Sequence, residues 1–454
     1  MSEQEVKFKD RFLFALNGFP DLMTYQFFQA TVFVFYFTVI GLETFVMWVG
    51  YVIWGFWNMF NDPLLGYLSD KKKYGKYGKR RYFILLAFIP LCLMMIFLFT
   101  VPIAPSGIEI FYFIFIIILF ELVYTLFDVN VKSLFPEMWP TEQERSKTNV
   151  ILRIVTILAI LAAFMIPAFL IPDIGGGLVE LPYYVTSGII VAIVVAITGF
   201  FFVFYGIKEK EESQEQRDKR PNFFTSLKIT FKNKNFVVLV LANMFTWFVL
   251  NMLTTMFSLY CTTVLGISIS DTFLGLGPFL FYGLSIVLAF LVAAMVMPLH
   301  KKIGQKYGMR TGFMITMIIM AISFIPFLFY GSNTLSRLLA MINAGVIGFG
   351  ISGIMFYFDI LMGYVIDEDE VKTGVKRSAS FYGTNAFIHR FSIILFISSV
   401  YLVFQYTAWQ TSFVPTGALD VIIGMQLLLS VFPAIACILA FILMYFFKFG
   451  RKRT

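Results

Sequence analysis

Two polar side chains in an otherwise apolar stretch have the types and spacing of ligands for a small hard cation. Asn58 and Asp62 lie four residues apart, so they share one face if the stretch is helical. Pro63 follows, and because proline has no amide hydrogen, the carbonyl of Met59 lacks its helical donor. Carboxylate, amide and carbonyl oxygens suit hard cations. The alternative is that Asp62 only hydrogen-bonds a neighbouring helix beside a proline kink.

A second stripe of polar residues occurs at helical spacing in a stretch of Phe, Ile and Leu. Glu121, Thr125, Asp128 and Lys132 follow one another at intervals of four, three and four. An ionisable side chain in hydrocarbon costs about 2.5–3.5 kcal/mol on insertion scales, so this stripe predicts a face lining a water-filled path. Asp128 and Lys132 can also form an internal ion pair that neutralises itself. Such a pair is compatible with a position in a binding cavity.

Other polar residues in apolar stretches are weaker candidates for ligand contacts. Asp21 and Tyr25 are one helical turn apart and present a carboxylate and a ring, although Asp21 also suits the cytoplasmic interface. The long side chain of Arg153 can extend to that interface. Two further shared faces occur later in the chain: Asn243, Trp247 and Asn251 on one, and Asn385 and His389 on the other, beside Arg390. For His389 ordinary packing is the simpler interpretation.

The elements that carry these residues are membrane-spanning helices. The 454 residues are 59% hydrophobic and 14% charged, against roughly 45–50% apolar in soluble domains. A spanning helix needs about 20 apolar residues. Twelve such stretches are centred near residues 32, 55, 92, 122, 158, 194, 247, 285, 320, 350, 392 and 436. We therefore predict an all-α integral membrane protein.

The basic residues indicate the orientation of the chain. The net charge is +8, and nearly all of the 35 lysines and arginines fall in alternate loops between the predicted spans. This is the positive-inside pattern, so both termini are predicted to be cytoplasmic, and the first span lacks a cleavage site. The bilayer explains the charge without nucleic acid as a partner.

The sequence contains no motif that is typical of a metal site, a disulfide framework or an enzyme active site. Three cysteines and two histidines are scattered through the sequence, which argues against a disulfide framework or a metal site. Nucleotide-binding loops and nucleophile motifs are not found, and the loops are too short for a soluble catalytic domain. We predict no enzymatic activity and no cofactor.

Two internal echoes divide the chain into halves. The pentapeptide "KYGKR" at Lys76–Arg80 recurs as "KYGMR" at Lys306–Arg310, after the second and eighth predicted spans. Tyr124 and Asp128, like Tyr357 and Asp359, precede an acidic-then-basic segment. These echoes predict a duplicated transporter with parallel halves. The mixed-charge run "KEKEESQEQRDKR" lies between them. The predicted segments are a six-helix bundle over 1–207, a cytoplasmic linker over 208–234 and a second six-helix bundle over 235–454.

Three stretches resemble one transporter family. "NDPLLGYLSD" followed by "YGKYGKRR" is similar to the second span and loop of the glycoside-pentoside-hexuronide:cation symporters, the melibiose permease family within the major facilitator superfamily. "YTLFDVNVKSLFPEM" resembles the fourth-span motif of that family, and "VIDEDEVKTGVKRSASFYG" resembles the loop after its tenth span. The resemblance implies twelve transmembrane helices in two six-helix bundles, which alternate access to a site near the midplane.

The resemblance also implies roles for single residues. Asp62 would bind the coupling cation with Thr125, whereas Asn58 stands where the family has a second carboxylate, which leaves Na⁺ coupling, H⁺ coupling and uncoupled transport open. Lys132 replaces an aromatic ring of sugar-transporting relatives, while Arg153 and Arg390 match family bases. Three bases favour a ligand with a carboxylate or phosphate. The predicted substrate-binding residues are Asp21, Tyr25, Asp128, Lys132, Arg153, Trp247, Asn251 and Arg390.

The basic loops are predicted to control the transport cycle. They hold the loops on the cytoplasmic side, and the resemblance implies a network between the bundles that locks one state. The predicted gating residues are Asp70, Lys76, Arg80, Arg81, Lys306 and Arg310.

Together these features predict a monomeric secondary active transporter in the cell membrane. Its solute would be a glycoside, sugar or hexuronide, coupled to H⁺ or Na⁺. The alternatives are a lysophospholipid carrier of the same family and a membrane receptor or scaffold that does not transport.

Overall fold

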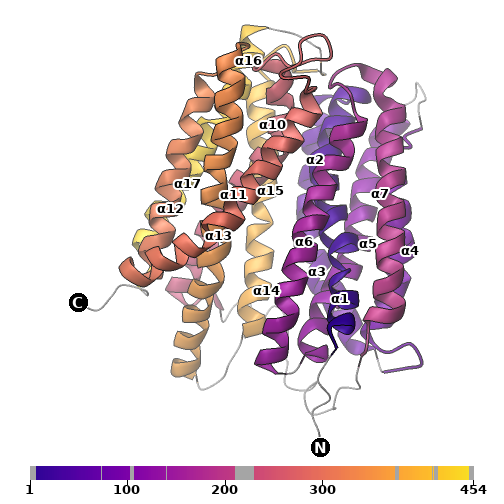
Figure 1. Cartoon of the computed structure of the whole chain (residues 1–454), viewed down its shortest axis with the longest axis vertical. Helices are drawn as coiled ribbons and strands as arrows, with labels where there is room; N and C mark the ends of the chain where they lie inside the picture. Colours follow the sequence, from indigo (N-terminus) through magenta and orange to yellow (C-terminus); the bar gives the residue numbers. More distant parts are fainter. Residues whose placement is uncertain are drawn as a thin grey trace, which may run out of the picture. The chain divides into compact units, whose positions relative to one another are not determined.

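The computed structural model describes residues 7–72, 74–102, 107–139, 141–209, 230–373, 378–411, 413 and 418–448. The structural statements below refer to these residues. They form long helices (Figure 1). The pairing between Phe273 and Leu276 is an isolated β-bridge. Eleven helical segments of this part of the chain are long and apolar enough to cross a membrane.

The N-terminal half folds into α-helices that short 3₁₀- and π-helical turns extend. In chain order these are α1 (Phe8–Ala15), η1 (Phe19–Met23), α2 (Thr24–Val34), η2 (Phe35–Val39), α3 (Thr44–Lys71), α4 (Arg80–Phe97), α5 (Ile108–Met138), α6 (Glu142–Leu170), η3 (Gly177–Glu180), α7 (Leu181–Phe201) and η4 (Phe202–Gly206). The C-terminal half contains α10 (Lys234–Thr263), α11 (Pro278–Tyr307), α12 (Met309–Phe324), η5 (Ile325–Leu328), α13 (Thr334–Thr373), α14 (Ser378–His389), α15 (Phe391–Phe404), α16 (Leu419–Leu429) and α17 (Val431–Tyr445).

Helix α3 completes the predicted set of twelve spans. It has 28 residues, which is enough to cross the hydrocarbon, and Pro63 lies inside it as the sequence indicates. It is not among the eleven strongly apolar segments, because Asn58, Asn61 and Asp62 lower its hydropathy. The all-α, twelve-helix fold predicted from the sequence is confirmed, and its least apolar span carries the candidate cation ligands.

Three predicted spans contain a break in the α-helix. The first span extends from Phe8 to Val39, so its centre lies closer to the N-terminus than the predicted position near residue 32. The α-helix of this span is interrupted by the π-helical turn η1. A π-turn inserts an extra residue and rotates the side chains that follow, and such turns occur often at functional sites. The eleventh span is divided at Arg390 into α14 and α15, and the twelfth at Ser430 into α16 and α17.

The described residues group into two compact units. The first contains the described residues of Met1–Ile40, Phe60–Ile171 and Gly177–Arg220, and the second contains those of Gly41–Met59, Pro172–Gly176 and Pro221–Thr454. The first half of α3 thus belongs to the second unit, where Trp48 Nε1 donates a 3.1 Å hydrogen bond to Ser398 Oγ. Most of the predicted linker 208–234 lies outside the described residues, so the predicted bundle boundaries stay predictions.

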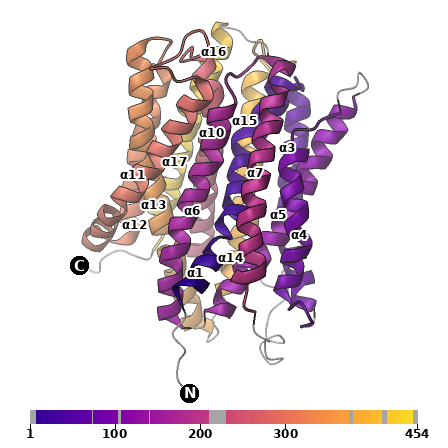
Figure 2. The same ribbon diagram turned by 45° about the vertical axis from the view of Figure 1, so that its right-hand side comes forward.

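Small residues let helices approach closely within each unit. In the first unit α4 packs against α5 and α7, and a Cβ atom added at Gly188 would lie 2.3 Å from the carbonyl oxygen of Met95 (Figure 1). In the second unit α11 packs along α13, and a Cβ atom at Gly348 would lie 2.2 Å from the carbonyl oxygen of Ala289 (Figure 2). Such contacts are a common means of packing helices in membranes.

The acidic stretch after the tenth span is helical, although the sequence predicts a loop. Helix α13 runs for 40 residues, through the acidic stretch to Thr373. Lys372 Nζ lies 2.5 Å from Glu368 Oε1 one turn away, and Asn235 donates a 2.9 Å bond to the other carboxylate oxygen of Glu368. These contacts, together with residues of good helix propensity, extend the helix. At about 1.5 Å per residue, α13 is longer than the roughly 30 Å hydrocarbon layer.

Candidate transport site

A buried carboxylate and two stacked tyrosines form one corner of the first unit. Asp21 lies in η1 with 7% of its surface exposed, and Tyr124 of α5 donates a 2.9 Å hydrogen bond from its hydroxyl to Asp21 Oδ1. The ring of Tyr25 stacks on Tyr124 with centroids 4.9 Å apart. The sequence also allowed Asp21 to lie at the interface. Its burial and its tyrosine partner instead hold it inside the helical bundle.

The predicted ion pair on α5 is present beside that corner. Lys132 Nζ lies 2.8 Å from Asp128 Oδ2, while the Lys132 side chain is 70% exposed and that of Asp128 is 7% exposed. Asp128 Oδ1 has no hydrogen-bond partner in the described part of the chain. Lys132 also interacts electrostatically with Asp21 and Asp62. The pair therefore belongs to a larger charged group and is not an isolated surface contact.

One hydroxyl joins two acidic side chains from two helices. Thr125 Oγ1 lies 3.1 Å from Asp62 Oδ1 and 3.3 Å from Glu121 Oε1. Asn61, adjacent to Asp62 on α3, donates a 3.0 Å bond from its amide to the backbone carbonyl of Glu121. These bonds fix the register of α3 against α5, and they bring together two of the predicted cation ligands.

The third predicted cation ligand, Asn58, is buried and makes no side-chain hydrogen bond to the described residues. Asn58 lies one turn before Asp62 on α3 and is fully buried, and its amide nitrogen and oxygen have no partner among the described residues. A buried polar group without a partner costs about 1–3 kcal/mol. Asn58 is therefore an unusual side chain that packing alone does not explain.

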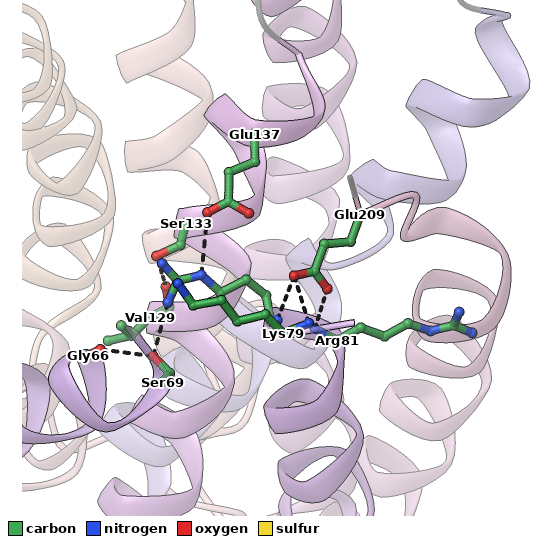
Figure 3. Close-up of polar contacts among 9 residues, drawn as sticks. Gly66, Ser69, Lys79, Arg81, Val129, Ser133, Glu137 and Glu209 are labelled. Carbon is green, nitrogen blue, oxygen red and sulfur yellow. Dashed lines mark hydrogen bonds and ion pairs between the residues drawn. The ribbon is translucent and has the colours of Figure 1, made fainter. Parts of the chain in front are cut away.

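Arg80 is buried where α4 begins, in contact with two other helices. Its Nη1 donates a 3.0 Å bond to Ser69 Oγ at the end of α3, and its Nε lies 3.4 Å from Glu137 Oε1 at the end of α5. Ser69 in turn donates to the carbonyl of Gly66, and Figure 3 shows Ser69 and Glu137 among the polar contacts of this region. This predicted gating residue thus fastens the ends of α3 and α5 to α4.

Glu209, to which the sequence analysis assigned no role, caps α4. Its carboxylate accepts hydrogen bonds from the backbone N–H groups of Lys79, Arg80 and Arg81, at 2.9, 2.8 and 3.1 Å (Figure 3). An acid at a helix N-terminus satisfies orphan donors and complements the helix dipole. Gly78 has φ +77°, and a Cβ atom there would lie 2.2 Å from Glu209 Oε2, so the cap requires glycine. The sequence position of Glu209 could not indicate this role, because Glu209 lies in a mixed-charge run far along the chain from the start of α4.

The other predicted gating residues of the first unit take different positions. The side chain of Arg81 points away from Glu209 in Figure 3, while its backbone N–H donates to that acid. Lys76 Nζ lies 5.8 Å from the ring centroid of Tyr77. The side chain of Asp70 lies outside the described part of the structure. Among the predicted gating residues of this unit, the side chain of Arg80 joins helices, through its contacts with Ser69 on α3 and Glu137 on α5.

Arg310 holds the corresponding place in the second unit. It is 4% exposed, and its Nε donates a 2.7 Å bond to the carbonyl of Met444, while its Nη2 donates to the carbonyl of Tyr445. These carbonyls end α17, so the arginine satisfies groups that the helix itself leaves open. Lys306 Nζ lies 5.0 Å from the ring centroid of Tyr307.

Neutral side chains form the polar contacts of the second unit where the predicted substrate residues lie. Asn251 Nδ2 donates a 3.2 Å bond to Ser392 Oγ, and the Trp247 ring stacks on His389 with centroids 5.1 Å apart. Asn243 donates a 3.0 Å bond to Asn385. The two predicted faces of amides and rings therefore meet. Arg390 lies next to them, half-buried, at the break between α14 and α15.

Arg153 is not brought to the charged group by any contact in the described residues. It lies on α6 with an exposed side chain. Lys132 is already paired with Asp128, so the predicted excess of positive charge rests on Arg153 and Arg390.

Comparisons with known proteins identify the family. A family model described as MFS/sugar transport protein matches residues 13–451. An isoprimeverose transporter of Lactiplantibacillus pentosus is 22% identical over 86% of this chain and 78% of its own length. A putative sulfoquinovose importer of Escherichia coli is 24% identical over 92% of this chain and 86% of its own length. Among solved structures, the nucleoside transporter NupG superposes with a TM-score of 0.63 at 15% identity, covering 97% of this chain and 98% of that chain.

Proposed function

Because the chain belongs to the MFS/sugar transport family and is a multi-pass membrane transporter, we propose that it carries a sugar or sugar acid coupled to H⁺ or Na⁺. Its two halves would alternate access to the solute by rocking, with both termini in the cytoplasm and with the chain acting as a monomer. The family match supports solute transport, and the buried charges of the first unit support the coupling.

The observation that carries this proposal is the group formed by Asp21, Tyr124, Asp128 and Lys132. Two carboxylates and an ammonium group present acceptors and donors side by side. Sugar hydroxyls both donate and accept, so Asp128 Oδ1, which has no partner in the described residues, can receive one of them. The stacked rings of Tyr25 and Tyr124 offer the apolar surface that lines most small-molecule sites.

The charge of the solute depends on Lys132. A neutral sugar can leave the 2.8 Å bond between Lys132 and Asp128 intact, whereas a sugar acid must draw the ammonium group toward its own carboxylate. Of the relatives, one is named for isoprimeverose and another for sulfoquinovose, a sugar that bears a sulfonate. We propose that the solute belongs to this class of sugars, and that Lys132 decides between neutral and acidic members.

Uptake into proteoliposomes tests the proposal. Labelled pentosides, hexuronides and lysophosphatidylcholine are offered to the full chain under an imposed Na⁺ gradient, an imposed H⁺ gradient or neither. A sugar should accumulate only with an ion gradient, and Asp62→Asn should reduce accumulation to equilibration. Glu43→Gln, which removes an exposed acid outside the charged group, is the control and should behave like the parent. Uptake of lysolipid alone, or accumulation by Asp62→Asn equal to that of the parent, would reject the proposal.

A Lys132 variant then separates the two kinds of solute. Lys132→Met removes the ammonium group and keeps most of the length of the side chain. Uptake of a sugar acid should fall about tenfold or more, because a charge-assisted bond is lost. Uptake of a neutral sugar should fall less. Equal losses for both solutes would show that Lys132 positions Asp128 and does not read the charge of the solute.

A further inference from the structure

We propose that Glu121 supplies the second carboxylate of a Na⁺ site, together with Asp62, Thr125 and Asn61. This inference rests on the proposed cation coupling and adds to it a ligand from α5. Glu121 is part of the polar stripe of α5 that the sequence predicts, but the spacing alone indicates no role for it. On α3, Asn58 occupies the position at which the resembled family has its second carboxylate, so α3 contributes one carboxylate, that of Asp62, to the proposed site.

The geometry around Thr125 brings the two acids together. The single hydroxyl hydrogen can be donated to only one carboxylate at a time, yet the oxygen lies 3.1 Å from Asp62 and 3.3 Å from Glu121. The nearest oxygens of the two acids are therefore no farther apart than these two distances together. Two acidic groups at this separation repel when both are ionised, and a cation between them removes the repulsion.

Asn61 is an independent sign of a ligand at this place. It is fully buried, and its amide nitrogen is fixed on the backbone carbonyl of Glu121 at 3.0 Å. Because amide oxygen and nitrogen share one carbon, Oδ1 lies beside the same turn of α5. Oδ1 has no hydrogen-bond partner among the described residues. Buried acceptors are nearly always satisfied, and a cation satisfies an oxygen as well as a donor does.

One of the two acids, Asp62, also belongs to the charged group around Lys132. The neighbouring groups that interact with Lys132 are Asp21 from η1, Asp62 from α3 and Asp128 from α5. The 2.8 Å hydrogen bond of Lys132 goes to Asp128. Asp62 thus belongs to a group in which three acids share one base, and Glu121 lies next to Asp62 across the Thr125 hydroxyl. Carboxylate, hydroxyl and amide oxygens are hard donors, which suit a small hard cation such as Na⁺.

Ion titration of the purified full chain tests the assignment. Thermal unfolding is followed at about pH 8 while Na⁺, Li⁺, K⁺ or choline is added at constant ionic strength. Na⁺ and Li⁺ should raise the unfolding temperature saturably, and K⁺ and choline should not. Glu121→Gln should weaken the apparent Na⁺ affinity about tenfold or more. Glu109→Gln makes the same change on the same helix, about 18 Å away at 1.5 Å per residue, and should leave the affinity unchanged.

Two further variants separate lost binding from lost folding. Glu121→Asp keeps the charge and should retain a weaker Na⁺ response. The double variant Asn58→Asp with Glu121→Gln returns a carboxylate one turn before Asp62 and should regain part of the response. A Na⁺ affinity unchanged in Glu121→Gln but lost in Asp62→Asn would reject Glu121 as a ligand and leave coupling through Asp62 standing. A parent protein that responds to protons and not to Na⁺ also overturns the assignment. Accumulation that survives Asp62→Asn rejects the proposed coupling itself.

Discussion

The two units meet the problem of polar groups in a membrane in different ways. The first unit holds ionisable side chains, Asp21, Asp62 and Asp128 with Lys132, on η1, α3 and α5. The second unit uses amides, a hydroxyl and stacked rings, such as Asn251 on Ser392 and Trp247 on His389. Charged groups interact over longer distances and respond to ions, whereas neutral hydrogen bonds depend on shape. We therefore expect the proposed ion coupling to depend on the first unit and the recognition of neutral groups to depend on the second.

The largest expected effect is the loss of the carboxylate of Asp128. Asp128→Asn removes the ion pair with Lys132 and an acceptor for the solute. A hydrogen bond to a charged group contributes about 1.5–3 kcal/mol, so transport efficiency should fall about 100-fold. Because the Lys132 side chain is 70% exposed, water can solvate the released ammonium group, and the protein should still fold.

Initial uptake rates as a function of solute concentration measure this loss, with the unfolding temperature as the control for folding. If transport by Asp128→Asn is near that of the parent, Asp128 and Lys132 form a self-neutralising pair, and the charged side of the comparison loses its main support.

The two buried arginines give the next effect, on stability. Arg80→Gln removes bonds to Ser69 and Glu137, whereas Arg310→Gln removes bonds to the carbonyls of Met444 and Tyr445. Each change removes hydrogen bonds that a buried guanidinium group donates and should cost about 2 kcal/mol. Denaturation in mild detergent measures both.

The difference between the two arginines should appear in a double-mutant cycle. Glu137→Gln should reduce the cost of Arg80→Gln, because their ion pair is then already absent, and it should not change the cost of Arg310→Gln. If the interaction free energies of Glu137 with Arg80 and with Arg310 were equal, the ion pair between Arg80 and Glu137 would contribute nothing specific to the stability of the first unit.

A smaller effect is expected from the neutral side of the comparison. Asn251→Ala removes a 3.2 Å bond between uncharged groups. Neutral hydrogen bonds contribute about 0.5–1.5 kcal/mol, so uptake should fall about five- to tenfold, with the dependence on Na⁺ or H⁺ unchanged. Uptake measured at several ion concentrations tests both parts. A change in ion dependence would place Asn251 in the coupling machinery and end the division between the units.

Sequence spacing predicted contacts within one helix better than contacts between helices. The bond between Asp128 and Lys132 follows from the four-residue interval. The bond between Asn61 and the Glu121 backbone depends on the register of α3 against α5, which one sequence does not specify. The position of Asp21 depends on the π-turn η1, which rotates the residues around Pro20 in a way that simple periodicity does not predict.

The extent of elements at the ends of spans was also difficult to predict. The acidic run after the tenth span has the composition of a loop, yet it continues α13, because the pair formed by Glu368 and Lys372 and the bond from Asn235 stabilise a helix. Glu209 caps α4 because four orphan N–H groups begin that helix, a requirement visible only once its start is known. The fold class was predictable from hydropathy alone, while the bonds that position the candidate site were not.

The smallest expected effect concerns an ion pair in the second unit that lies outside the candidate site. Arg337 makes two bonds, of 3.0 and 2.6 Å, to the carboxylate of Asp271, in the loop between α10 and α11. The hydrogen bond from the guanidinium group lowers the pKa of Asp271 below its usual value. The contribution of this pair to stability is therefore complete above the unfolded pKa of about 3.9 and is lost as the pH falls through the lower folded pKa.

Thermal unfolding followed from about pH 6 down to about pH 3 should show a loss of stability in the parent that is smaller in Asp271→Asn. The remaining loss comes from other acids, so the difference between the two curves isolates this pair. The difference should be small and should shrink in high salt, since Asp271 is solvent-exposed. A difference that persists in high salt would mean that ionic bonds also hold the second unit together, and the contrast between the units would then apply only to the residues around the candidate site.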